Sequence, residues 1–137
     1  MKRRTSVAIA LAAVLSFAAA GVTVGGAPLE LTFEKSLAGA GVWEGTVGGD
    51  ETGTIETYLA AVNEAGSVWY VTFDWTVEID GGDRIIAEVE GIINLRTGRV
   101  VMNGEVLDGY LVGSRIHVEA QLDLTDMSSE GTMLITP

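Results

Sequence analysis

The chain has 137 residues, with eight basic and nineteen acidic side chains and no cysteine. That length indicates one domain. The missing cysteines exclude a disulfide scaffold, a thiolate metal site, a cysteine nucleophile and a lipoprotein anchor. Hydrophobic residues make up 47% of the chain, which excludes wholesale disorder, and eighteen glycines against two prolines favour β-structure with many turns.

The first twenty residues have the features of an export signal. A positive cluster, Lys2-Arg3-Arg4, precedes an apolar run that ends in Ala18-Ala19-Ala20, the small residues that a signal peptidase recognises. Cleavage is expected before Gly21, with Gly25-Gly26-Ala27 as the alternative site. The apolar run of about 14 residues is shorter than the roughly 20 that a membrane-spanning helix needs.

We therefore expect residues 1–20 to be a signal peptide and residues 21–27 to be a flexible N-terminal segment. A retained N-terminal anchor is the alternative. The mature protein is expected to be secreted, extracellular or periplasmic, with no membrane span after cleavage.

Removal of the signal makes the mature chain strongly acidic. Three of the eight basic residues leave with it, so five remain against nineteen acidic residues, a net charge of −14. The five are scattered along the chain and form no basic stripe, so neither nucleic acid nor an anionic membrane surface is an expected partner. The acidity indicates solubility outside the cell. The five are Lys35, Arg84, Arg96, Arg99 and Arg115.

The mature chain predicts eight strands and no helix, because apolar and polar residues alternate with period two. The strongest case is the run Ser67–Asp80, where the apolar residues from Trp69 to Ile79 share one face. Glycine-rich turns such as Gly81-Gly82-Asp83 separate the segments. The expected strands are 28–34, 41–48, 52–62, 67–80, 84–94, 99–107, 111–124 and 131–136.

Eight short strands with short connections favour an all-β fold, an antiparallel eight-stranded up-and-down β-barrel over residues 28–137. A sandwich is the alternative, but it usually needs longer crossovers. The polar faces carry full charges and the apolar faces carry Trp, Phe and Ile, so we expect the apolar side to face inward. That is the reverse of an outer-membrane barrel.

A family resemblance follows from glycine spacing and strand rhythm. It is carried by Val42-Trp43-Glu44-Gly45-Thr46-Val47-Gly48, Gly91-Ile92-Ile93-Asn94 with Thr97-Gly98, Val101-Met102-Asn103-Gly104, Gly109-Tyr110-Leu111-Val112-Gly113 and Gly131-Thr132. This pattern resembles the allene oxide cyclase-like barrels, relatives of dirigent-type and spirotetronate cyclase barrels, in an exported bacterial form. The resemblance implies an eight-stranded barrel whose interior can hold an apolar small molecule. No catalytic residue of those cyclases matches a position here.

An apolar stripe is the candidate ligand-binding surface. It consists of Trp43, Trp69, Phe73, Trp75 and Met102, with Met133 as an alternative to Met102. Either these side chains fill the barrel, which eight strands make just wide enough for that, or they line a cavity for one hydrophobic ligand. Inward-facing small residues would leave room for the ligand, and the candidates are Gly45, Ala87, Gly91 and Ala120.

Candidates for chemistry are few. Asp74, in the aromatic-rich strand, and Glu44, beside Trp43, would be acids or bases if they faced inward, because burial raises a carboxyl pKa. The simpler interpretation places both on the outer surface. His117, the only histidine, is expected to face solvent, opposite Ser114. The acidic turns match no calcium motif, so no metal and no cofactor are expected.

Three functional hypotheses remain open. The first is that the barrel binds a small apolar molecule in its lumen. The second is that it is a cofactor-free isomerase or cyclase, which folds a flexible substrate into a reactive conformer. The third is that it is a non-catalytic extracellular or cell-envelope structural or interaction module. Pairing of barrel walls in a homo-oligomer also stays open, since barrels of this kind often pair through the wall, although no exposed patch is legible in the sequence.

Overall fold

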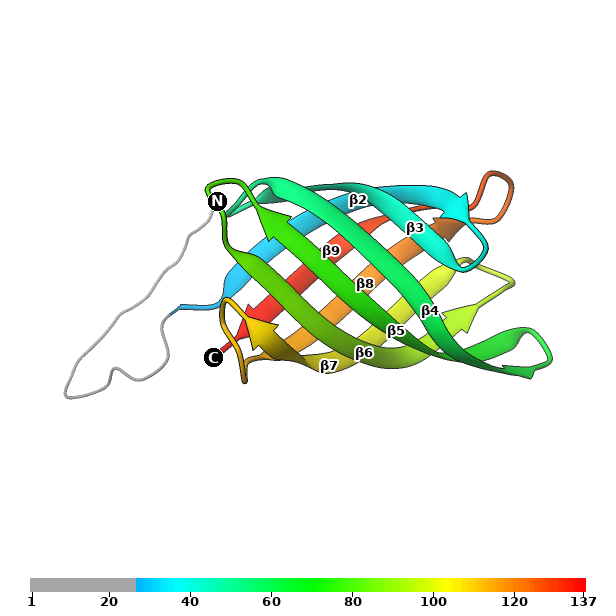
Figure 1. Cartoon of the computed structure of the whole chain (residues 1–137). Coiled ribbons are helices and arrows are strands. Elements are labelled where there is room, and N and C mark those ends of the chain that lie inside the picture. The colour runs from blue at the N-terminus through cyan, green and yellow to red at the C-terminus, as the bar shows by residue number, and fades with distance from the viewer. Residues whose placement is uncertain (1–26) are drawn as a thin grey trace.

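Eight antiparallel strands close into a barrel in the computed structural model, which describes residues 27–137 (Figure 1). The expected signal peptide, and all but the last residue of the expected flexible segment, lie outside the described residues. Across residues 27–137 the chain has no helix long and apolar enough to cross a membrane. The strands are β2 (Leu29–Gly39), β3 (Val42–Gly49), β4 (Gly53–Ala65), β5 (Val68–Ile79), β6 (Arg84–Asn94), β7 (Arg99–Gly109), β8 (Arg115–Asp123) and β9 (Ser128–Thr136).

Each strand pairs with its neighbours in sequence, and β9 closes the barrel against β2, with Leu31 opposite Met133. The predicted up-and-down barrel is therefore confirmed. The connections β2–β3, β4–β5, β6–β7 and β8–β9 lie at one end, on the right in Figure 1, which we call the distal end. The start of β2 and the end of β9 lie at the other, the terminal end.

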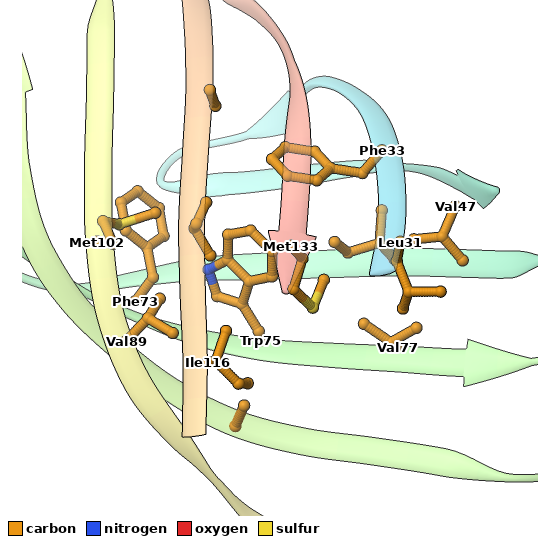
Figure 2. Close-up of a cluster of buried hydrophobic side chains, with 14 of the residues drawn as sticks. Leu31, Phe33, Val47, Phe73, Trp75, Val77, Val89, Met102, Ile116 and Met133 are labelled. Carbon is orange, nitrogen blue, oxygen red and sulfur yellow. The ribbon is translucent and has the colours of Figure 1, made fainter. Parts of the chain in front are cut away.

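Alternation along the strands builds the core. In β5, Phe73, Trp75 and Val77 are at most 4% exposed, whereas the intervening Asp74 is exposed on the outer wall. The inward side chains of all eight strands meet in one hydrophobic cluster, with Trp75 near its centre (Figure 2). Burial of this apolar surface is the main stabilising contribution in a chain without disulfides.

Two inward glycines have a different role from the one predicted. We expected Gly45 and Gly91 to leave room in the lumen, but backbone of the adjacent strand occupies that space. A Cβ on Gly45 would lie 1.8 Å from the Glu34 carbonyl oxygen, and one on Gly91 would lie 2.0 Å from that of Val101. The missing side chains therefore let neighbouring strands approach closely and bend the sheet.

The strand boundaries differ from the prediction in several places, and β2, which was predicted to end at residue 34, continues to Gly39. β8 begins at Arg115, not at residue 111, because Leu111 and Gly113 have positive φ angles of 65° and 90° and form a turn. Val112, which lies inside the predicted strand 111–124, is consequently in a turn and 62% exposed. β4 continues to Ala65 and not only to residue 62, β7 continues to Gly109 and not only to residue 107, and β9 begins at Ser128 and not at residue 131.

The β4–β5 hairpin extends past the barrel wall at the distal end (Figure 1). Pairing between β3 and β4 ends at Val42 opposite Tyr58, and a bulge follows between Leu59 and Ala61. Beyond the bulge, β4 pairs with β5 alone among the described strands. At the distal end the wall therefore continues as a two-stranded extension made by β4 and β5.

Candidate functional site

A buried lysine is the most unusual side chain of the lumen. Leu31, Phe33 and Lys35 are successive inward residues of β2, and Lys35 is only 8% exposed. Its neighbours across the sheet are Gly45 on β3 and Ser129 on β9. The side chain of Lys35 extends into the barrel, where its Nζ lies 4.5 Å from the ring centroid of Trp75.

The amine of Lys35 has one hydrogen-bond partner. Its Nζ donates to Oγ1 of Thr57 at 2.8 Å, and Thr57 is itself completely buried on β4. None of the ion pairs formed within residues 27–137 includes Lys35. A charge without a counter-charge in an apolar interior is costly, and one neutral acceptor offsets only part of that cost.

Four aromatic rings surround the amine. Phe33 packs edge-to-face on Trp75 with ring centroids 5.2 Å apart, and Trp43 packs on Phe73 at 5.6 Å. Ring faces attract a cation and so favour the ammonium form. From Lys35 Nζ, the ring centroids lie at 4.5 Å for Trp75, 5.3 Å for Phe73, 5.6 Å for Phe33 and 5.9 Å for Trp43.

Burial nevertheless dominates the ionisation of this amine. Loss of hydration lowers the pKa of Lys35 from 10.5 to about 7. Near neutral pH a large share of the molecules therefore carries a free amine, with a lone pair that an ordinary lysine lacks at that pH. The site combines a hydrogen-bond donor, a nucleophile and a wall of aromatic carbon.

A small void lies beside the amine. Its volume is about 30 Å³, close to the share of one water molecule in the liquid, and side chains of the hydrophobic cluster surround it. In Figure 2 the indole of Trp75 lies between Phe73 and Met102 on one side and Leu31 and Val77 on the other. The void is lined by Phe33, Lys35, Trp43, Phe73, Trp75, Ile93, Val100, Met102, Ala120, Leu122 and Ser129.

One polar atom of this lining is unpaired. The indole Nε1–H of Trp75 is buried and has no hydrogen-bond acceptor among the described residues. An unpaired buried donor costs stability. An acceptor atom placed in the void is the kind of group that would recover part of this loss.

The void lies next to the surface at the distal end. Trp43 donates from Nε1 to the carbonyl oxygen of Met127 at 3.0 Å, which ties β3 to the β8–β9 connection. Lys35, Leu122 and Ser129 line both the void and an open groove on the surface at this end. These three side chains therefore form the partition between the void and the outside.

The structure brings together four of the five predicted ligand-binding residues. Trp43, Phe73, Trp75 and Met102 line the void. Trp69 packs against the core but lies outside the lining, because it is the first inward residue of β5 at the distal end.

The two carboxylates considered as acid or base lie elsewhere. Asp74 and Glu44 are exposed on the outer wall, facing away from the void. The structure does not bring either of them to the lumen.

His117 lies on the outer wall, as predicted, and Ser114 is buried on the opposite side. The histidine joins a surface cluster: Nδ1 is 2.7 Å from Oδ1 of Asn103, and Nε2 is 2.9 Å from Oε2 of Glu119. Arg99 also contacts Glu119, at 2.8 Å. The hydrogen bond with His117, together with the charge of Arg99, lowers the pKa of Glu119.

Sequence reasoning missed Lys35, Thr57 and Ser129. A signal for Lys35 was present, since extending the alternation Leu31, Phe33 by two residues places the lysine on the inward face. The alternation carries no information on which strands meet, so it gives no reason to pair Lys35 with Thr57, 22 residues away.

No family model, curated protein or solved structure matches this chain.

Proposed function

We propose that this protein is an exported barrel that binds a small molecule at Lys35, in the distal half of the lumen. The ligand class is an apolar body that carries one oxygen acceptor, such as a carboxylate or a carbonyl. One observation carries the proposal, the buried Lys35 amine without a carboxylate partner.

The stability cost of this amine supports a role in binding. A barrel that needed only a packed core would be more stable with an apolar side chain at this position. Two donors, Lys35 Nζ and Trp75 Nε1, belong to the same cluster of side chains, and the second has no acceptor. An oxygen acceptor is the chemistry that this pair would recognise, and the surrounding rings suit an apolar body.

Binding of anything larger than a water-sized group requires the distal end to open. The side chain that would move is Trp43, which packs on Phe73 and donates one hydrogen bond to Met127 in the β8–β9 connection. A cofactor-free isomerase or cyclase, which the allene oxide cyclase-like resemblance implies, would use the same opened site to hold its substrate in a reactive conformer.

A second candidate is a non-catalytic extracellular or cell-envelope module. The observation that favours it is the void of only about 30 Å³, which makes the lumen a packed core in this conformation.

Native mass spectrometry of the protein secreted by its own host tests the proposal. We expect a bound mass that is lost on denaturation, and a much smaller bound fraction in Lys35→Met, which keeps the side-chain length and removes the amine. The matched control is Glu44→Gln, which removes a charge from the outer wall and should retain the ligand.

Two results together would contradict the proposal: wild-type protein that carries no bound mass, and tryptophan emission that does not change on titration with short-chain carboxylates. The non-catalytic module would then be the remaining function. The same spectra give the oligomeric state, and the chain mass shows whether export removed residues 1–20.

A further inference from the structure

The lumen contains the elements of a covalent site for carbonyl compounds. Lys35 is the only lysine after Lys2 in the sequence, and its Nζ is in the interior, hydrogen-bonded to one hydroxyl. An amine that is not held by a carboxylate keeps its lone pair available when it is deprotonated. Around it, the facing groups on β3, β4 and β9 are Gly45, Thr57 and Ser129, none of which titrates near neutral pH.

The void lies where a second reactant would sit. It adjoins Lys35 and its volume of about 30 Å³ suits one small group, such as the carbonyl oxygen of a short aldehyde, so the rest of the molecule enters only when the distal end opens. The lining is mostly apolar, and a water-poor site favours condensation over hydrolysis. Trp75, whose buried N–H has no acceptor among the described residues, is one of the residues that line the void.

We propose that Lys35 forms an imine with a short-chain aldehyde in the lumen of the barrel. The proposal rests on the ligand site proposed above and names the substrate class of that site. It specifies an aldehyde carbonyl as the acceptor group and a covalent bond to Nζ as the mode of binding.

The step is balanced without a further reactant. The Nζ lone pair adds to the carbonyl carbon, the C=O π bond breaks, and a proton passes from nitrogen to oxygen to give a carbinolamine. The carbinolamine then loses its hydroxyl group and the remaining N–H proton as water, and the C=N bond forms. Thr57 Oγ1, 2.8 Å from Nζ, is placed to pass a proton in either step.

Reductive trapping with acetaldehyde and cyanoborohydride at pH 7.5 tests the inference. We expect one ethyl group on Lys35 of the folded protein, located by proteolysis and mass spectrometry. The labelling rate should be at least tenfold higher than for the same lysine in the urea-unfolded chain, because ordinary lysine is almost entirely protonated at this pH. Lys35→Met should lose this adduct and keep the one on the α-amino group.

The α-amino group serves as the internal reference, since it titrates near 7.7–8.0 in any exposed terminus. Folded wild-type protein that gains ethyl on the α-amino group and none on Lys35 would overturn the inference. That result would leave the proposed binding function standing if host-derived protein still carried a bound mass. Loss of both the adduct and the bound mass would remove the binding function as well.

Discussion

At the scale of single residues, Lys35 couples the stability of the barrel to pH. Its pKa is about 7 when buried and 10.5 when hydrated. Between these values the unfolded chain binds more protons than the folded chain, so the free energy of unfolding rises with pH, by about 1.4 kcal/mol per pH unit at most. Below pH 7 both states are protonated and the cost of burial is fully present.

Lys35→Met should therefore stabilise the protein, most at low pH. We expect the variant to exceed wild type by a few kcal/mol at pH 6, because it removes a buried charge with no counter-charge. The difference should shrink steadily as the pH rises from 7 to 9.5. Urea unfolding of both proteins across this range measures it.

The control for this prediction is Arg84→Met, which removes an exposed cation from a surface pair with Glu78. Its effect should be small, because surface ion pairs contribute little. A constant difference between Lys35→Met and wild type across the whole pH range would contradict the lowered pKa.

At the scale of strands, the close approach of β2 and β3 depends on Gly45. Gly45→Ala places a Cβ 1.8 Å from a backbone oxygen of β2, and backbone cannot move aside without breaking ladder hydrogen bonds. We expect a loss of more than about 2 kcal/mol in the free energy of unfolding, from overpacking and lost pairing. Chemical denaturation measures the loss.

Gly39→Ala is the matched control, because a Cβ at Gly39 meets no atom within 4 Å. Its effect should stay within about 0.5 kcal/mol. Equal effects of the two substitutions would show that close strand approach at Gly45 does not limit stability.

The hydrogen bond from Trp43 to Met127 links β3 to the β8–β9 connection. Trp43→Phe removes the donor while keeping an aromatic ring, so this connection should open more often, at a cost of about 1 kcal/mol. Amide hydrogen exchange should accelerate at Met127, whose N–H donates to Asp123, and remain unchanged at Leu95 in the β6–β7 connection. Unchanged exchange at Met127 would mean that Trp43 does not hold the distal end closed.

Alternation explains how much of the strand pattern could be predicted. A period of two identifies the inward face of β5 and β6 without any knowledge of the fold. It fails at Leu111–Ser114, where the residues still alternate but positive φ angles at Leu111 and Gly113 make a turn. Backbone conformation of this kind leaves no trace in hydrophobicity.

The residues of the candidate site could be predicted in part, but the void beside them could not. Trp43, Phe73, Trp75 and Met102 were predicted because their strand faces are visible in the sequence. The size of the void beside them could not be predicted, because it depends on how closely neighbouring strands approach one another. The sequence suggests that Gly45 leaves free space in the lumen, but in the folded barrel the backbone of β2 occupies that space.

At the scale of the whole molecule, acidic side chains face one another on the outer wall. Asp74 lies opposite Glu88 in the β5–β6 pair, and Glu88 lies opposite Glu105 in the β6–β7 pair. Arg115 ends this row, opposite Glu105. Like charges directly across strands are destabilising, and the excess of acidic over basic residues adds to the repulsion.

Ionic strength should therefore raise the stability of this barrel. Raising NaCl from about 10 mM to about 0.15 M shortens the Debye length from about 30 Å to about 8 Å and screens the carboxylates from one another. We expect the Tm to rise over this range.

Glu88→Lys replaces the central member of the row by a cation with two acidic neighbours, so it should raise the Tm at low salt and reduce the response to NaCl. Glu78→Lys is the control, because it adds the same charge change but removes the partner of Arg84. A wild-type Tm that does not change with NaCl, or a Glu88→Lys response equal to that of Glu78→Lys, would show that repulsion along this row does not limit the stability of the molecule.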